Sequence, residues 1–173
     1  LPNPVTALPA PPPSVTGLDL PEFVTGLLLP EDLLFGPGGL LYSTDRDTDL
    51  VTSYDAEGMP LATFGLGTGL EEPSGLAFGP LGDLFVSSFG TDEIYIFDVL
   101  GEAPPGDGGP PTISDPALDG PAGLAFDLNG QLYVSSYNSD EILVFDPSGV
   151  LVDTISDPAL DGPWGLAIGR DGN

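Results

Sequence analysis

The sequence contains no cysteine, no histidine and no lysine among its 173 residues. The lack of cysteine excludes disulfide bonds and thiolate metal sites. The lack of histidine removes the imidazole base that activates serine nucleophiles, and the lack of lysine removes Schiff-base chemistry and the phosphate-binding loop. Many enzyme mechanisms are therefore excluded by composition alone, and no catalytic residue or organic cofactor is predicted.

Positive charge is also scarce, because 27 Asp and Glu stand against two Arg and the formal net charge is −25. Arg46 and Arg170 each have acidic neighbours in the sequence, so local neutralisation is their predicted role. A chain of this charge repels nucleic acid and anionic lipid headgroups. No apolar run is long enough to cross a bilayer as a helix. Nucleic-acid binding and membrane insertion are therefore excluded, and basic proteins or Ca²⁺ are the expected partners.

The first residue is Leu1 rather than methionine, and the chain is acidic, free of cysteine and rich in proline and glycine. This combination is typical of an exported protein whose signal peptide has been removed. We therefore expect an extracellular, cell-surface or periplasmic location.

Glycine and proline, at 25 and 21 residues, are organised by an internal repeat. Residues 73–98 (PSGLAFGPLGDLFVSSFGTDEIYIFD) align without a gap with residues 121–146 (PAGLAFDLNGQLYVSSYNSDEILVFD). Residues 30–55 are a weaker copy, a fourth copy begins at Pro163, and the segment TISDPALDGP occurs twice. A period of 42 to 48 residues between copies predicts a repeat architecture.

Each copy has the pattern of four short strands separated by turns rich in glycine and aspartate. Strands are predicted at 75–78, 84–89 and 93–97 in one copy, and at 123–126, 132–137, 141–145 and 151–155 in the next. The third strands have apolar residues at successive positions, so both faces of each sheet are expected to be buried. The predicted fold is all-β, a β-propeller of four-stranded antiparallel blades. A flat solenoid is the alternative, and it predicts fewer strands in a shorter repeat.

The pattern P-x-G-L-A-F-D-x-x-G-x-L-Y-V-S-S-Y-x-x-D-x-I-x-V-F-D-x-x-G over residues 121–149 resembles the NHL repeat, and the likeness covers about residues 30–173. The resemblance implies a propeller that closes with five or six blades. Typical NHL copies carry basic or amide residues between the second and third strands. This sequence instead has Asp92, Glu93, Asp140 and Glu141 there, a departure that counts against a basic-surface role such as RNA binding.

Two regions are predicted along the chain. Residues 1–22 form a Pro-rich extended arm or linker. Residues 23–173 form a partial propeller, with blades at about 30–72, 73–120 and 121–162 and the start of a further blade at 163–173. Propellers need roughly four to eight blades to close. The ring is therefore expected to be incomplete in this chain, with the remainder supplied by a longer polypeptide or by another chain.

The ends of this partial ring carry a further prediction. Residues 23–27 precede Pro30 as residues 151–155 precede Pro163. They are therefore predicted to act as an outer strand, either of a missing blade or of the last blade in a ring closed by the N-terminus. An unpaired strand edge at either end would invite pairing with another chain.

Three acidic residues, Asp45, Asp47 and Asp49, alternate in the first copy between its second and third strands. Alternating carboxylates in a loop can wrap Ca²⁺. The run lacks the glycine and the final glutamate of an EF-hand loop, so it is not one. The hypothesis is a calcium site, and the alternative is a solvated acidic turn.

The same turn carries Asp92 and Glu93 in the second copy and Asp140 and Glu141 in the third. Together these residues would form an acidic rim that binds cations or a basic partner, or that only keeps the protein soluble. Trp164, the single tryptophan, is predicted at the end of the central tunnel. It would stack on a ligand or partner, or fill the gap between blades.

The expected function is that of a non-catalytic extracellular scaffold or binding propeller, which contacts a protein or ligand through its turns and open strand edges. One alternative is a metal-dependent hydrolase or lyase of the lactonase type. Such an enzyme needs oxygen ligands at the starts of the inner strands, and among Glu31, Ser74, Ala122 and Trp164 only the first is a credible ligand. The other alternative is a subunit of an assembly built by edge-strand pairing.

Overall fold

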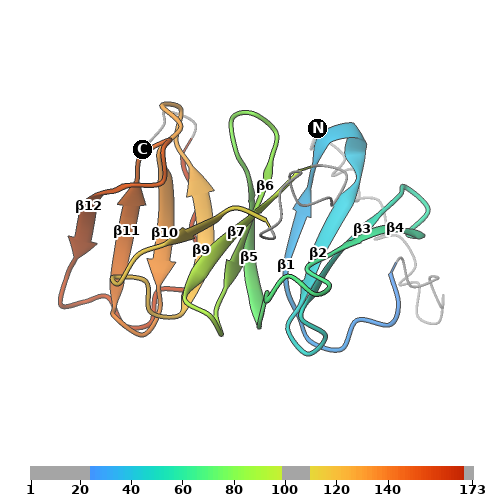
Figure 1. The fold of residues 1–173 in the computed structure, drawn as a ribbon, viewed down its shortest axis with the longest axis horizontal. Helices are drawn as coiled ribbons and strands as arrows, with labels where there is room; N and C mark the ends of the chain where they lie inside the picture. Colours follow the sequence, from blue (N-terminus) through green and yellow to red (C-terminus); the bar gives the residue numbers. More distant parts are fainter. Residues whose placement is uncertain (1–23, 99–109, 170–173) are drawn as a thin grey trace, which may run out of the picture.

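The chain folds as three antiparallel β-sheets of four strands each, placed side by side (Figure 1). A computed structural model describes residues 24–98 and 110–169. The strands are β1 (Pro30–Phe35), β2 (Leu41–Asp45), β3 (Leu50–Tyr54), β4 (Pro60–Phe64), β5 (Pro73–Phe78), β6 (Leu84–Ser88), β7 (Glu93–Phe97), β8 (Thr112–Ser114), β9 (Pro121–Phe126), β10 (Leu132–Ser136), β11 (Glu141–Phe145) and β12 (Leu151–Ser156). The predicted all-β architecture of propeller blades in an incomplete ring is confirmed.

Each sheet is a meander in which strands that follow one another in sequence also pair in space. A single 3-10 turn at Pro37–Gly39 joins β1 to β2. The third strands β7 and β11 begin and end at the residues predicted for them. No helix long and apolar enough to cross a membrane occurs among the residues that the structure describes.

Apolar side chains pack between neighbouring sheets rather than within one. In the second blade, Leu76 and Val86 belong to the core shared with the first blade, whereas Ala77 and Ile94 belong to the core shared with the third. This division follows from the alternation of side chains across a strand. Because full burial of an apolar side chain contributes about 1.5–3 kcal/mol, each blade depends on its neighbours for most of its stability.

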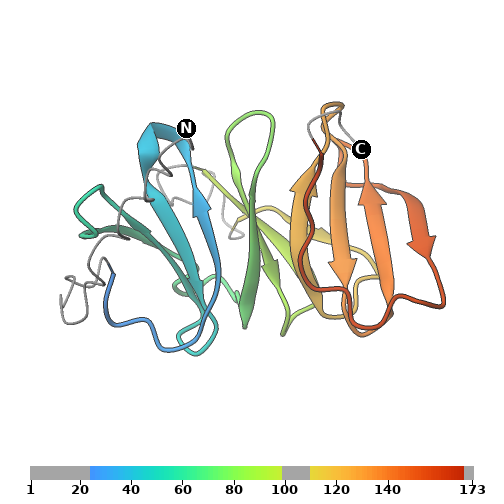
Figure 2. The same cartoon turned by 180° about the vertical axis from the view of Figure 1, so that it is seen from behind.

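The first strands of the blades, β1, β5 and β9, lie next to one another and form the inner side of the partial ring. Figure 2 shows that the chain after β12 returns along the third blade. This returning segment, residues 163–169, runs close to β9, because a Cβ atom built at Gly123 would lie 2.3 Å from the carbonyl oxygen of Trp164. It occupies the place of a fourth inner strand but is not paired as a strand.

Residues 24–27, the described part of the outer strand predicted at 23–27, are not paired as a strand. The missing or closing blade to which that strand would belong is not among the three described sheets, so its pairing stays a prediction. A fourth strand needs the third strand of the same blade as its pairing partner, and β1 follows this segment directly. Gly26 also has a φ of 87°, which breaks an extended conformation. The predicted arm at 1–22 lies outside the described residues.

Buried hydroxyl groups link each blade to the next at the inner strands. Ser87 of β6 accepts a hydrogen bond from the Gly75 amide at 2.7 Å and donates one to the Ala122 carbonyl of the third blade at 2.6 Å. Thr44 and Ser135 make the equivalent bonds in the first and third blades. We call these three side chains the hydroxyl links, and all three are fully buried.

Candidate binding site at the mouth of the channel

A cavity of about 250 Å³ lies along the inner strands. Its lining comes from β1, β5, β9 and the returning segment, and consists of Glu31, Asp32, Leu34, Ser74, Gly75, Leu76, Ala122, Gly123, Leu124, Trp164, Gly165 and Leu166. Apart from Leu34, these residues occupy equivalent repeat positions in successive copies. The cavity is therefore the channel of the partial ring, and the residues after the leading prolines, including Glu31 and Trp164, lie at one end of the strands that line it.

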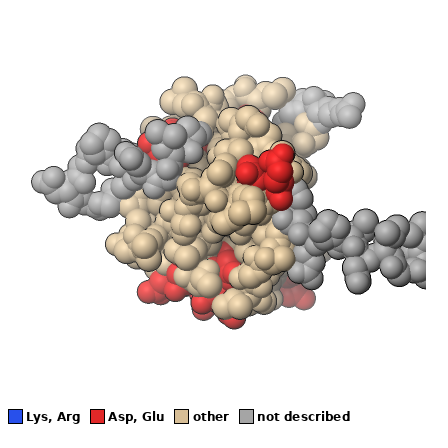
Figure 3. Space-filling model, turned by 90° about the vertical axis from the view of Figure 1, so that its right-hand side faces the viewer, with Lys and Arg blue, Asp and Glu red and all other residues tan. Residues whose placement is uncertain are grey.

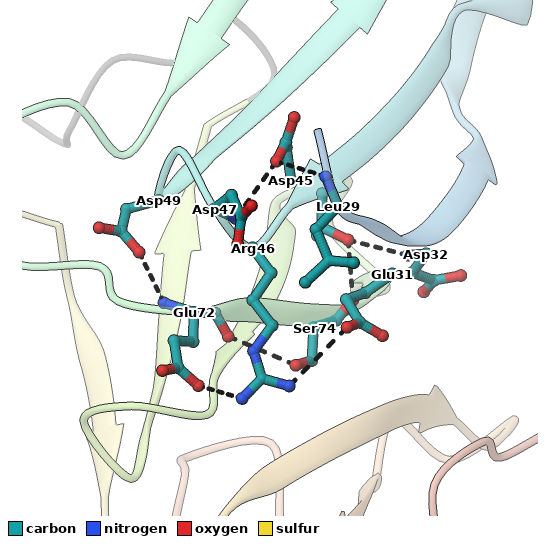
Figure 4. A network of polar contacts seen from close by, with 10 residues as sticks. Leu29, Glu31, Asp32, Asp45, Arg46, Asp47, Asp49, Glu72 and Ser74 are labelled. Carbon is teal, nitrogen blue, oxygen red and sulfur yellow. Dashed lines mark hydrogen bonds and ion pairs between the residues drawn. The ribbon is translucent and has the colours of Figure 1, made fainter. Parts of the chain in front are cut away.

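Arg46, in the turn after β2, lies beside this end of the channel. Its guanidinium forms ion pairs with Glu72, which precedes β5, and with Glu31 at 3.8 Å (Figure 4). The guanidinium carbon also lies 4.9 Å from the centre of the Phe89 ring, a cation–π contact. The predicted neutralisation by its sequence neighbours is therefore corrected, because the acids that pair with Arg46 come from two other segments. Arg170 lies outside the described residues.

Three aromatic rings, those of Phe89, Tyr137 and Trp164, meet next to Arg46. We call them the aromatic cluster. The Tyr137 and Trp164 rings stand edge to face at 5.3 Å and 82°, and the Phe89 ring lies 5.8 Å from Trp164 and 6.0 Å from Tyr137. Trp164 and Tyr137 remain 37% and 38% exposed. The cluster therefore packs the blades together and still presents apolar surface at the channel mouth.

The position that follows the second strand explains why these side chains meet. Arg46, Phe89 and Tyr137 occupy this position in the three copies, so the ring brings them to adjacent places. Trp164 comes from the position after the leading proline of the fourth copy. Of the residues around Arg46 and the aromatic cluster, only Trp164 was predicted from the sequence as a site residue.

The acidic turn residues have a shared structural position. Asp49, Asp92 and Asp140 each accept a hydrogen bond from a backbone amide just before the next blade, those of Glu72, Gly120 and Gly162, at 2.8–2.9 Å. All three aspartates have a φ between 56° and 58°, a left-handed conformation that aspartate tolerates better than most residues. These carboxylates fasten each turn to the following inter-blade connection. Binding at Asp92 and Asp140, and at Glu93 and Glu141 at the starts of β7 and β11, stays a prediction.

Asp45, the last residue of β2, is buried and 5% exposed. Its carboxylate accepts hydrogen bonds from the amides of Leu28 at 2.8 Å and Leu29 at 3.2 Å. Asp47 is exposed, and the Asp49 carboxylate is bonded to the Glu72 amide. Within residues 24–98 and 110–169, no group of three or more His, Cys, Asp or Glu side chains is placed to hold a metal ion. Calcium binding by Asp45, Asp47 and Asp49 stays a prediction.

Asp32 is one of the two carboxylates that line the channel cavity, the other being Glu31. The oxygens of Asp32 accept hydrogen bonds from the amides of Leu76 and Leu33, each at 2.8 Å. Burial raises the pKa of Asp32 above its ordinary value, and the two amide bonds offset part of this effect. In the second and third copies the equivalent position holds glycine, Gly75 and Gly123, so this carboxylate is peculiar to the first blade.

We expect the replacement Asp32→Asn to become more stabilising, relative to the wild type, as the pH rises. A carboxyl whose pKa is raised in the folded state stabilises the protein fully below the ordinary Asp pKa of 3.8, and this stabilisation is lost as the pH rises through the folded pKa. Asparagine stays neutral and keeps an oxygen acceptor. The free energy of unfolding of Asp32→Asn minus that of the wild type should therefore increase between about pH 4 and pH 7, as measured by urea denaturation. A difference that falls with pH would contradict the prediction.

No family model and no curated protein matches this sequence. Solved structures do match. One match is virginiamycin B lyase from Staphylococcus aureus, in a catalytically inactive variant with a histidine replaced by alanine and with quinupristin. It is 17% identical with a TM-score of 0.66, and the match covers 79% of this chain and 44% of that one. The WD40 β-propeller domain of Doa1 is 15% identical with a TM-score of 0.67, over 83% and 45%. A nidogen/laminin complex is 21% identical with a TM-score of 0.64, over 82% and 52%.

These similarities agree with the blades described above and identify the fold as a β-propeller. The chain spans about half the length of the matched structures. At such low identity the likeness concerns the fold alone, and the neighbours include both a lyase and proteins in binding roles.

Proposed function

We propose that this chain is an NHL-like β-propeller that acts as a non-catalytic binding module, with the aromatic cluster and the turns around it as the recognition surface. The partner is a protein or a ligand held at the channel mouth. The observation that supports this proposal is the exposure of Tyr137 and Trp164, 38% and 37%, at the edge of the cavity in the partial ring. Partly exposed aromatic side chains on a rigid scaffold are enriched where proteins bind partners.

The arrangement of the channel supports binding better than catalysis. Its two carboxylates, Glu31 and Asp32, come from the same blade, and each already has a partner, Arg46 for the first and backbone amides for the second. The matched lyase is described as inactive once one histidine is replaced, and this sequence contains no histidine. A metal-dependent reaction would need several converging oxygen ligands.

The proposal is tested by screening the protein against arrays of purified proteins and glycans. The replacements Trp164→Ala and Tyr137→Ala should each lower the affinity for a true partner at least tenfold, because they remove central aromatic contacts. Leu66→Ala is the matched control, since Leu66 is 83% exposed in a turn between the first two blades. Partners that bind all four proteins equally well would contradict the proposal.

A second candidate function, assembly with other copies of the chain, is favoured by one observation. The segment TISDPALDGP occurs twice, and its isoleucine is 8% exposed at Ile113 but 44% exposed at Ile155. Likewise Leu76 is 3% exposed, whereas its equivalent Leu33 in the first blade is 58% exposed. The side chains at these repeat positions are thus buried where two blades meet and exposed on the outer faces of the first and third blades.

Most of the open face of the first blade is uncharged; acidic residues gather along its lower margin, and others lie to the right of its centre and at its upper left (Figure 3). Phe35, 72% exposed, lies on this face with Leu33. Sedimentation equilibrium should therefore give a mass above the 17.7 kDa of one chain, and Phe35→Ser and Ile155→Ser should return it to the monomer. Leu66→Ser is the control. A monomeric mass for the wild type at all concentrations would exclude this candidate.

A further inference from the structure

A second cavity, of about 740 Å³, lies at the opposite end of the blades from the aromatic cluster. The register places it there, because β5 pairs with β6 from Pro73 opposite Ser88, beside the cluster, to Phe78 opposite Leu84, beside this cavity. We call it the apolar groove. It is lined by Phe78, Gly79, Pro80, Leu81, Asp83, Phe85, Ile96, Phe126, Asp127, Leu128, Asn129, Gly130 and Pro147.

The floor of the groove is apolar. The rings of Phe85 and Phe126, from the second and third blades, meet edge to face at 4.9 Å and 75°. Both rings are half-buried, as is Ile96. The volume falls in the range of about 300–1,000 Å³ typical of ligand sites, which are mostly apolar with a few polar groups.

Two leucines in turns border this floor and are among the most exposed apolar side chains of the described residues. Leu81, between β5 and β6, is 92% exposed, and Leu128, between β9 and β10, is 83% exposed. Single exposed leucines are common on protein surfaces, but two beside an open aromatic floor form a contiguous apolar patch. No part of the channel mouth contributes to it.

The charged side chains that line the groove are both acidic, Asp83 and Asp127. Burial acts to raise the pKa of Asp127, but hydrogen bonds from the Gln131 amide and from Asn129 outweigh it and lower the pKa overall. Asp127 is therefore an anion at neutral pH. The one arginine among the described residues, Arg46, lies at the other end of the blades. The groove thus combines an apolar floor with a negative margin.

We propose that the apolar groove binds an extended segment of a partner protein in which bulky apolar side chains stand beside Lys or Arg. The apolar side chains enter between Leu81 and Leu128 and contact the Phe85–Phe126 pair. The basic side chains lie near Asp83, which is half-buried. Asp127 is 8% exposed and bonded to its own turn, so it adds negative potential rather than a direct ion pair. The net charge of −25 also favours the approach of the basic side chains. This site is separate from the aromatic cluster and goes beyond the function proposed above.

The test uses two fluorescein-labelled peptides, GKLFKG and its acidic counterpart GELFEG, and measures fluorescence anisotropy with the full chain. GKLFKG should bind at least tenfold more tightly than GELFEG, and the difference should shrink in high salt. Leu128→Ser should weaken the binding of GKLFKG at least fivefold, and Asp83→Asn about threefold. Leu66→Ser should leave it unchanged, since Leu66 and Leu128 are both 83% exposed. Both leucines are in exposed turns, so these variants should fold.

Several outcomes overturn the proposal. These are the absence of GKLFKG binding at millimolar concentration, equal binding of the two peptides, and equal weakening by Leu128→Ser and Leu66→Ser. If GKLFKG does not bind and the Leu128→Ser variant has a lower mass in solution than the wild type, the groove binds a second copy of the chain. That outcome would also overturn the proposal. Trp164→Ala should leave GKLFKG binding intact, which separates this test from that of the channel mouth.

Discussion

The replacement Gly75→Ala is expected to destabilise the protein by about 3 kcal/mol, at the upper end of the usual cost of overpacking. A Cβ atom at Gly75 would lie 2.1 Å from the carbonyl oxygen of Ala122. That oxygen belongs to the backbone of β9 and accepts the hydrogen bond from Ser87. It cannot move aside as a side chain could, so the inner strands of the second and third blades must separate.

Thermal unfolding should show this cost as a fall of about 6–12 °C in Tm, since each kcal/mol corresponds to about 2–4 °C in a chain of this length. Gly165→Ala is the matched control. Gly165 occupies the same repeat position in the fourth copy, and a Cβ atom there would meet nothing within 4 Å. The control should change stability by less than about 0.5 kcal/mol. Similar small effects at both glycines would show that the inner strands are not closely packed.

The replacement Ser87→Ala is expected to cost about 2–4 kcal/mol. The hydroxyl of Ser87 is fully buried and serves two backbone groups, the Gly75 amide and the Ala122 carbonyl. Alanine would leave both groups without this partner, and a buried group left unsatisfied costs about 1–3 kcal/mol. Chemical denaturation should therefore show a lower midpoint, and the Gly75 amide should exchange its hydrogen faster.

Ser87→Thr is the control for this second prediction. The first blade has Thr44 at the equivalent position, where its hydroxyl accepts from the Asp32 amide at 2.9 Å and donates to the Ser74 carbonyl at 3.0 Å. Threonine at 87 should therefore retain both bonds and keep more than half of the stability that alanine loses. If Ser87→Ala proved as stable as the wild type, the hydroxyl links would not hold the blades together.

The fold could be predicted because several local signals agree. The strands at Glu93–Phe97 and Glu141–Phe145 have β-branched and aromatic residues between short polar turns, and they were placed without error. The repeat then implied that each sheet needs a neighbour on both sides. The second strands end one residue earlier than predicted, at Ser88 and Ser136, because the aromatic residue that follows turns toward the channel mouth.

The site was predicted less well, and Asp45 shows why. Its spacing from Asp47 and Asp49 indicated a cation ligand, whereas its position in the repeat is that of Ser88 and Ser136. Those serines accept hydrogen bonds from the amides of Glu71 and Asp119, each two residues before the leading proline of the serine's own blade. The Asp45 carboxylate accepts the equivalent hydrogen bond from the amide of Leu28, before its own blade. Comparison of the copies position by position would have identified this structural role.

Arg46 shows what sequence reasoning alone cannot supply. Its ionic partners, Glu31 and Glu72, are 15 and 26 positions away. The pairing of β1 with β2 brings Glu31 to Arg46, whereas Glu72 reaches it only because the second blade packs against the first. The apolar groove is similar, because its floor comes from strands of two blades and its margins from three turns. The repeat alignment does contain one signal for the aromatic cluster, namely the shared position of Phe89 and Tyr137.

The links between blades have a consequence for how such a chain changes in evolution. Each hydroxyl link and each aspartate bond joins a blade only to the one beside it, so the energetics depend on nearest neighbours. Duplication of the coding sequence for one blade would add a blade that brings its own hydrogen bonds to the neighbouring blade and would disturb no distant contact. Loss of a blade would be tolerated in the same way. The similar copies at residues 73–98 and 121–146, and the segment TISDPALDGP that occurs twice unchanged, are what duplication of this kind leaves behind.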